Sequence, residues 1–206
     1  MKIWLYAGTS ENLELLVIIG YHLFMIYNKS DNVSSADNQQ ERLLTGGALP
    51  RKWLSRIPPH IGYYLAGFVD GEGSFNVSLR REKDYRLGWQ PVLSFNVSQK
   101  DIKMLVLLKQ YLGCGIIKQR RRDGLYSYDV TNPKEITEKV LPFFNLYKFL
   151  SVSKIVNYSI FKKISKKMEQ KRHLNRDGLI EILELREKLN EGKGRTRKYT
   201  IIDVLN

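Results

Sequence analysis

One nine-residue stretch of this 206-residue chain is the most informative about its fold: Leu65-Ala66-Gly67-Phe68-Val69-Asp70-Gly71-Glu72-Gly73. Apolar residues at helical spacing predict a helix from His60 to Gly71. Gly67 and Gly71 share one face of it, and each costs about 1 kcal/mol relative to alanine. Such a face lets a second helix backbone approach closely. Glu72 is also unusual, because a carboxylate at a helix C-terminus meets the negative end of the helix dipole unless a cation is bound. The alternative is an ordinary core helix with a glycine cap and a solvent-facing glutamate.

The chain after this helix predicts two pairs of strands separated by a helix. Apolar residues alternate with polar ones in the first pair of strands, at Phe75, Val77 and Leu79 and again at Leu93, Phe95 and Val97. A helix capped by Asp101 follows and ends at Gly113. The remaining expected elements are a hairpin of 116–120 with 126–131, helices at 133–146, 151–168 and 177–190, and a short helix from 199. Antiparallel hairpins with helices gathered on one face define an α+β fold.

The composition indicates a basic protein that binds a polyanion. The chain carries 34 Lys and Arg against 21 Asp and Glu, with a formal net charge of +13. Within residues 60–206 there are 28 basic and 16 acidic side chains, so +12 of that charge lies in this part. A single cysteine and three histidines exclude a disulfide scaffold and a Cys-based zinc cluster. Nucleic acid or an anionic membrane is therefore the expected partner.

Residues 1–55 differ in composition from the rest and are predicted to form a leader before a domain at 56–206. Leu15 to Asn28 lacks charged residues, but these 14 residues fall short of the roughly 18–20 that span a bilayer. The open interpretations are a helix that packs on the domain or extends from it, a leader that is removed or disordered, and a membrane contact. A membrane partner is the least favoured of these.

The nine-residue stretch, with Tyr64 before it and Ser74-Phe75 after it, resembles the LAGLIDADG signature of homing endonucleases. The resemblance extends from about His60 to Asn206, because the predicted order of elements is also that of the family. It implies an αββαββα core in which an antiparallel sheet forms a DNA-binding saddle with helices on its other face. Residues 1–55 lie outside it.

The resemblance also implies an active site. Glu72, with the carbonyl of Gly71, corresponds to the family's ligands for a catalytic divalent ion, Mg²⁺ or Mn²⁺, although many members have Asp at position 72. Gln99 corresponds to a residue that organises water near the scissile phosphate, and Lys103 to a basic residue beside the site. The family's active-site lysine corresponds to Lys154, with Lys148 as the alternative.

The polar face of the first strand pair is the expected DNA-reading surface, because Arg, Asn and Gln pair with base edges in the major groove. An ordinary polar sheet face is the alternative. The candidate contacts, including those in the turn and the second hairpin, are Asn76, Ser78, Arg80, Lys83, Tyr85, Gln90, Ser94, Asn96, Lys118, Arg120 and Arg122. A basic helix from Lys162 to Arg176 is expected to contact phosphates or simply to face solvent.

The sequence contains one copy of the motif, which is typical of the homodimeric branch of the family. Two motif helices would then pack across a two-fold axis, and the predicted interface residues are Leu65, Ala66, Gly67, Phe68 and Gly71. The expected function is site-specific double-strand DNA cleavage at a roughly palindromic site, with no small-molecule substrate. The alternatives are a maturase that assists splicing of host intron RNA and a DNA-binding protein that does not cut. By resemblance, the expected location is a mitochondrion or chloroplast.

Overall fold

The computed structural model describes residues 52–191 and 197–205. Most of the predicted leader, including the Leu15–Asn28 run, lies outside the described residues. The described chain belongs to a compact unit, Pro50–Asn206, that begins slightly before the predicted boundary. Leu54, in the short 3-10 helix η1 (Leu54–Arg56), is only 4% exposed and packs in the core. None of the described helices is long and apolar enough to cross a membrane.

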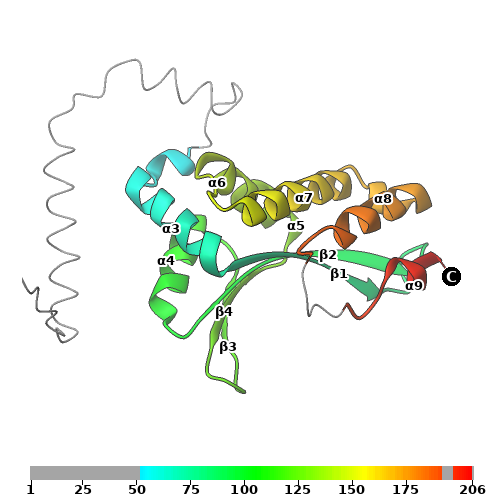
Figure 1. Ribbon diagram of the computed structural model, residues 1–206, viewed down its shortest axis with the longest axis horizontal. Helices are drawn as coiled ribbons and strands as arrows, with labels where there is room; N and C mark the ends of the chain where they lie inside the picture. Colours follow the sequence, from blue (N-terminus) through cyan, green and yellow to red (C-terminus); the bar gives the residue numbers. More distant parts are fainter. Residues whose placement is uncertain (1–51, 192–196, 206) are drawn as a thin grey trace, which may run out of the picture. The chain divides into compact units, whose positions relative to one another are not determined.

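The order of elements matches the prediction of a helix, two strands, a helix, two strands and further helices (Figure 1). The first part comprises α3 (Pro59–Glu72), β1 (Gly73–Arg81), β2 (Trp89–Gln99), α4 (Ile102–Leu112), β3 (Ile116–Gln119) and β4 (Tyr126–Val130). The second comprises α5 (Pro133–Glu135), the π-helical η2 (Ile136–Val140), α6 (Leu141–Leu146), α7 (Val152–Glu169), η3 (Arg172–Leu174), α8 (Arg176–Glu187) and α9 (Ile201–Leu205). The predicted α+β class is confirmed.

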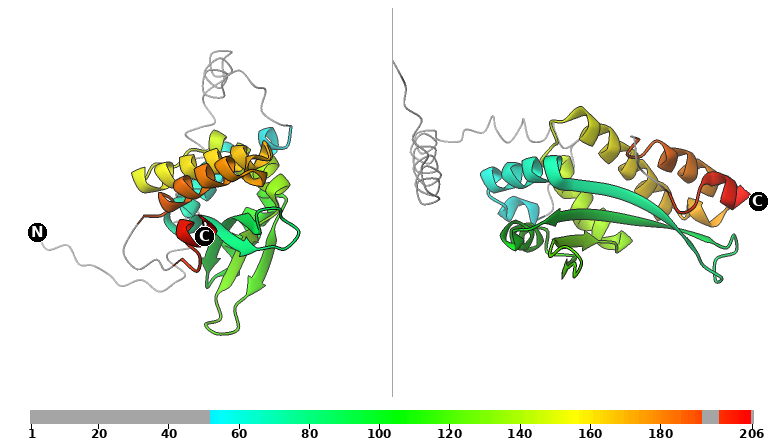
Figure 2. Two further views of the ribbon diagram at one scale, coloured as in Figure 1. Left: turned by 90° about the vertical axis from the view of Figure 1, so that its right-hand side faces the viewer. Right: turned by 60° about the horizontal axis from the view of Figure 1, so that its bottom comes forward.

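The four strands form one antiparallel sheet in the order β1-β2-β4-β3. Gly73 pairs with Val97 at the start of the long β1–β2 hairpin, and Phe95 pairs with Val130 where β4 joins β2. Helices α6, α7 and α8 lie along one side of β1 and β2 (Figure 2). The long hairpin therefore has one face packed on helices and one face available for binding.

The alternation predicted for the two long strands is confirmed by their burial. Phe75, Val77 and Leu79 are buried, and so are their partners in β2, whereas the residues between them are half-buried or exposed. Phe75 stacks on Phe95 with 5.2 Å between ring centroids. Aromatic residues of α6, α7 and the intervening loop surround this pair. Because each buried aromatic side chain stabilises the fold by about 1.5–3 kcal/mol, this cluster fixes the helices on the sheet.

The ends of α4 are capped as predicted. The Asp101 side chain accepts a hydrogen bond from the Lys103 N–H at 2.8 Å, which satisfies one of the free donors of the first turn. Gly113 ends the helix in the left-handed region at φ +65°. This short, well-ended helix connects the two hairpins.

Two helical predictions need correction. The predicted helix from Lys162 to Arg176 is wrong, because α7 ends at Glu169 and Lys171 adopts a left-handed φ of 58° before η3 and α8. The predicted helix 133–146 is present as three successive segments, of which η2 has π-helical spacing. Pro142 lies just after η2 and cannot donate a backbone hydrogen bond, so the regular α-helical ladder is interrupted there.

Candidate active site and nucleic-acid interface

Glu72 lies at the junction between α3 and β1, with its side chain exposed. The strand begins at the next residue, because Gly73 leaves the helix in an extended conformation (φ −80°, ψ 154°). A Cβ on Gly73 would lie 2.5 Å from a side-chain carbon of Val69 and 2.7 Å from its carbonyl oxygen. Only glycine fits this close approach, so the local sequence fixes the place of the Glu72 carboxylate at the end of the helix.

Lys154 is brought from the first turn of α7 to the same helix end. Its amine donates a hydrogen bond to the carbonyl oxygen of Gly73. Burial lowers the pKa of Lys154, and the negative charges of Asp70 and Glu72 partly offset that change. Lys148, the alternative lysine, is exposed before α7. A cation and a carboxylate thus meet where α3 becomes β1.

Asp70 holds α7 in this position. Its carboxylate accepts hydrogen bonds from the N–H groups of Leu150, at 3.0 Å, and Ser151, at 2.9 Å, and from the Ser151 hydroxyl. Burial alone would raise the pKa of Asp70, but these hydrogen bonds and the charge of Lys154 together bring it below its usual value. Sequence reasoning missed this role, because the partners of Asp70 lie 80 residues further along the chain.

Neither Gln99 nor Lys103 forms a hydrogen bond or ion pair with Glu72 among the described residues. Gly73 pairs with Val97 at the end of the β1–β2 ladder, and Gln99 lies two residues further along β2, opposite Tyr126 of β4. The Gln99 side-chain oxygen accepts from the Lys100 N–H at 3.2 Å. Lys103 is exposed in the first turn of α4. Among the described contacts, only Lys154 joins α7 to this end of the motif helix through a side-chain amine.

The exposed face of α3 differs in part from the predicted interface. Gly67 and Gly71 are exposed, and a Cβ built on either would meet no atom within 4 Å. Tyr64, 58% exposed, continues this face, and Phe68 is half-buried beside it. The prediction is wrong for two residues: Leu65 and Ala66 are 0% and 2% exposed and pack into the chain's own core. A turn of about 100° per residue directs them away from the glycines.

The predicted base-reading residues on the hairpin share the polar face of the sheet. Cross-strand pairs place Asn76 opposite Ser94 and Arg80 opposite Gln90. Ser78 and Arg80 are exposed, while the other members are half-buried. Some of their side chains are already engaged: Asn76 donates to Ser74, and Gln90 donates to the hydroxyl of Tyr85 at 3.0 Å. Asn96 is the most constrained, since it donates to both Ser127 and Asp129.

Basic residues of the turns and of β3 extend this surface. Lys83, Lys118, Arg120 and Arg122 are all exposed. Lys118 pairs with Ser127 in the β3–β4 register, which places it on the polar face. Arg120 and Arg122 lie 3.3 and 3.7 Å from Asp123, so the tip of this hairpin is partly neutralised. Tyr85 is half-buried, with its ring 6.2 Å from that of His173, and faces the helices more than the predicted surface.

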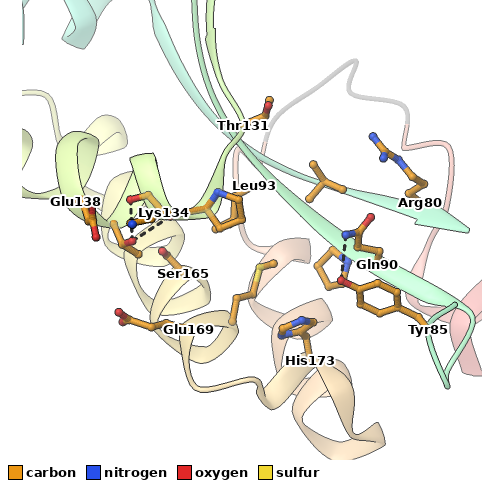
Figure 3. Close-up of a pocket in the computed structure, with 15 residues that line it drawn as sticks. Arg80, Tyr85, Gln90, Leu93, Thr131, Lys134, Glu138, Ser165, Glu169 and His173 are labelled. Atoms are coloured by element: carbon orange, nitrogen blue, oxygen red, sulfur yellow. Dashed lines mark hydrogen bonds between the residues drawn. The ribbon is translucent and has the colours of Figure 1, made fainter. Parts of the chain in front are cut away.

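A separate cavity of about 660 Å³ lies at the free edge of β2 (Figure 3). Its lining comes from the hairpin, α5, η2, α7 and η3, and includes neither Glu72 nor Lys154. Ser165 Oγ and His173 Nδ1 are buried there without a hydrogen-bond partner among the described residues. Burial lowers the pKa of His173. Sequence reasoning missed this cavity, because its residues come from distant segments with no common motif.

The donors at the end of α3 fit a hard divalent cation. Glu72 offers a carboxylate and Gly71 a backbone carbonyl, and Mg²⁺ prefers oxygen ligands of this kind while retaining several waters. Within residues 52–191 and 197–205, no group of three or more His, Cys, Asp or Glu side chains gathers around a common point. Further oxygen ligands would therefore come from DNA phosphates, water or a second carboxylate.

Comparison with known proteins shows similarity to one family. The family model "LAGLIDADG endonuclease" matches residues 65–165. The chain is 34% identical over 136 residues to "Probable intron-encoded endonuclease 3" of Neurospora crassa, which covers 65% of this chain. It spans only 25% of that relative's length.

Solved structures show the same similarity in three dimensions. The homing endonuclease I-TnaI superposes with a TM-score of 0.60 at 32% identity, covering 64% of this chain and 89% of that chain. I-SmaMI bound to cleaved DNA superposes with a TM-score of 0.60 at 34% identity, covering 65% of this chain and 45% of that chain. The residues that the family model matches, 65–165, include most of the motif helix and all four strands.

Proposed function

Because the chain belongs to the LAGLIDADG endonuclease family, we propose that it is a DNA endonuclease that cuts both strands at a specific site. The observation that carries this proposal is the meeting of Glu72 with Lys154 at the end of α3, beside the polar face of the sheet. A carboxylate and a cation thus lie where α3 becomes β1, at the start of the hairpin whose polar face we propose to read bases. I-SmaMI and I-LtrWI, two structural relatives, are described as bound to target or cleaved DNA, which supports DNA as the partner.

In the proposed reaction, the polar sheet face binds the major groove and the basic turns bind phosphates. Glu72 and the Gly71 carbonyl would hold Mg²⁺ or Mn²⁺, which when bound activates water and stabilises the leaving oxygen. The Lys154 amine, held by the Gly73 carbonyl, places a positive charge near the scissile phosphate. Gln99, two residues beyond the Gly73–Val97 pair on β2, would orient water.

We propose that a second copy of this chain supplies the second active site. The open face around Gly67 and Gly71 allows another α3 backbone to approach closely. The two Glu72 carboxylates would then lie near each other, and cations would relieve their repulsion. Each copy would cut one strand, so the target would be roughly palindromic.

The curated relative is named as intron-encoded, which supports an origin in an intron and, by family resemblance, an organelle location. A second candidate function is assistance of intron splicing as an RNA maturase. Exposed lysines on α7, at positions 162, 163 and 166, favour it, because they give the helical side a basic surface separate from the polar sheet face. If the purified protein accelerates splicing of the host intron in vitro and does not cut DNA, that alternative is established.

The test begins with selection from a randomised duplex library, because the target is not known in advance. The wild-type protein is expected to enrich one sequence with two-fold symmetry and, with Mg²⁺, to cut both strands within it. Glu72→Gln is expected to bind the same sequence and to cut it at least 100-fold more slowly, as removal of an essential group does. Glu184→Gln, an equal charge change on an exposed position of α8, serves as the control. Sequence-specific binding with no wild-type cleavage would refute the nuclease proposal.

A further inference from the structure

A row of cross-strand neighbours lies on the polar face of the sheet, and hydrogen bonds join its middle members. In the strand register Ser74 lies opposite Asn96, Asn96 opposite Asp129, and Asp129 opposite Ile116. These residues share one face, since directly paired residues of antiparallel strands point the same way. The row therefore belongs to the surface proposed to read DNA, although the sequence did not single out Asp129.

The amide of Asn96 has a fixed orientation within this row. Its nitrogen donates to Ser127 Oγ at 2.8 Å and to Asp129 Oδ1. The reverse orientation would direct the amide oxygen at a carboxylate, which accepts hydrogen bonds but cannot donate them. Both amide hydrogens of Asn96 are thereby used inside the protein, and its oxygen accepts from the Ser98 hydroxyl at 3.4 Å, so Asn96 has no donor left for DNA.

The Ser127 hydroxyl also uses its hydrogen inside the protein, so the Asp129 carboxylate oxygens remain as hydrogen-bond acceptors on this face. Having accepted from Asn96, the Ser127 hydroxyl donates to Asp129 Oδ2 at 3.0 Å. Asp129 receives one hydrogen bond on each oxygen, and a carboxylate can accept about four in all. It is half-buried and forms no ion pair with the described residues. Its cross-strand neighbour Ile116 is 48% exposed and has no side-chain hydrogen-bonding group.

A carboxylate without an ion-pair partner repels DNA phosphates. On this face Asp129 would therefore weaken DNA binding unless it accepts a hydrogen bond from a base. In the major groove, cytosine presents its N4 amino group as a donor without an acceptor of its own. Guanine and thymine present acceptors, and adenine presents the N7 acceptor beside its amino group. Asn96 has no amide hydrogen left for that N7. We propose that Asp129, supported by Asn96, is a specificity-determining acceptor that selects a cytosine in each half of the DNA target; this rests on the proposed function.

The proposal is tested by repeating the library selection with Asp129→Asn, which keeps the size of the side chain and removes its charge. Wild-type protein selects cytosine at one position in each half-site. Asp129→Asn loses that preference by about tenfold and leaves the other positions unchanged. Glu184→Gln, the matched charge control, keeps the wild-type sequence. If Asp129→Asn selects the wild-type sequence, or binds all sequences more tightly by one common factor, the inference is wrong while the endonuclease proposal stands.

A change in the DNA gives an independent result with unaltered protein. Replacing the selected cytosine by 2-pyrimidinone removes only its N4 amino group. Wild-type binding is expected to weaken about tenfold, whereas Asp129→Asn binds both duplexes equally. The same replacement at another cytosine of the site corrects for weakened base pairing. Equal losses at both positions would overturn the inference, and failure of the wild type to select any sequence would instead overturn the proposed function.

Discussion

Single residues at the end of α3 connect parts of the chain that are far apart in sequence. Asp70 accepts from the backbone of Leu150 and Ser151, and Lys154 donates to Gly73, 81 residues away. The carboxylate of Asp70 ties the two residues that precede α7 to the end of α3. The position of the Lys154 amine therefore depends on Asp70 as well as on α7 itself.

Asp70→Ala removes these hydrogen bonds, and we expect the free energy of unfolding to fall by about 1 kcal/mol, the order expected for lost hydrogen bonds. The effect is modest because Leu150 and Ser151 are exposed and water can replace the lost acceptor. Urea unfolding at pH 7 measures it. Asp70→Asn, which retains an acceptor oxygen, should lose less. An unchanged unfolding curve for Asp70→Ala would show that these hydrogen bonds do not hold α7.

His173 predicts a pH dependence of stability. Burial lowers its pKa below the ordinary value of 6.5, so the unfolded chain takes up a proton first as the pH falls. Stability contributed by the neutral ring is therefore present above pH 6.5 and declines below it. His173→Phe keeps a ring beside Tyr85 and removes the buried nitrogen that lacks a partner.

We expect wild-type protein to lose unfolding free energy between pH 7.5 and pH 5.5, and His173→Phe to lose less over the same interval. Urea midpoints at the two pH values provide the comparison. The same decrease in both proteins would mean that other groups cause it and that His173 titrates normally.

The roles of individual residues could be predicted from the sequence where they depend on neighbouring residues. They could not be predicted where they depend on contacts with distant parts of the chain. Asp101 and Gly113 cap α4 as expected, because both act on their own neighbours. The motif indicated Glu72, but it could not show that Asp70, two residues earlier, binds the start of α7. It also could not show that Asp129 uses the amide of Asn96, since that pairing depends on the register of β2 with β4.

Among the secondary-structure elements, α3 has two faces with different requirements. Gly62 lies on the packed side, where a Cβ would come within 2.2 Å of the Tyr147 ring. That ring is 4% exposed and its hydroxyl donates to the Ile57 carbonyl at 3.2 Å. Gly67 lies on the other side, where a Cβ would meet nothing within 4 Å. One helix therefore contains a glycine required by the fold and a glycine available to a partner.

This contrast predicts opposite effects of the same substitution. Gly62→Ala should lower the free energy of unfolding by about 1–3 kcal/mol through overpacking. Gly67→Ala should raise that of the monomer by up to about 1 kcal/mol, because alanine favours helix. It should also weaken the pairing of two α3 helices, observed by sedimentation as a larger dimer dissociation constant. A destabilised Gly67→Ala monomer, or one that dimerises as well as wild type, would refute this interpretation of the face.

At the level of elements, periodicity predicted the strands and most helices but not their arrangement. Alternation in β1 and β2 identified the buried side correctly, since each buried residue lies two positions from the next. The order β1-β2-β4-β3 requires β4 to pair with β2 across α4, which no local pattern specifies. The helices predicted at 151–168 and 177–190 correspond to α7 and α8, whereas the basic stretch from Lys162 to Arg176 is not one helix, because α7 ends at Glu169.

For the whole molecule, the net charge of +13 indicated only the class of partner. The structure locates exposed basic residues at the turns beside the polar sheet face and on α7. The two residues to which we assign specific roles on this surface are negatively charged. Glu72 is proposed to hold a cation for cleavage, and Asp129 to select a base. We therefore expect that specificity and cleavage can be removed separately.

Cleavage of a supercoiled plasmid that carries the selected site tests whether Glu72 takes part in the chemistry. With Mg²⁺, wild-type protein should linearise it, and Glu72→Gln should bind the site but leave the plasmid supercoiled. Dimers with one wild-type and one Glu72→Gln copy, isolated by two different tags, should nick one strand. Linearisation by Glu72→Gln at the wild-type rate would contradict the account, because Glu72 would then have no part in the chemistry.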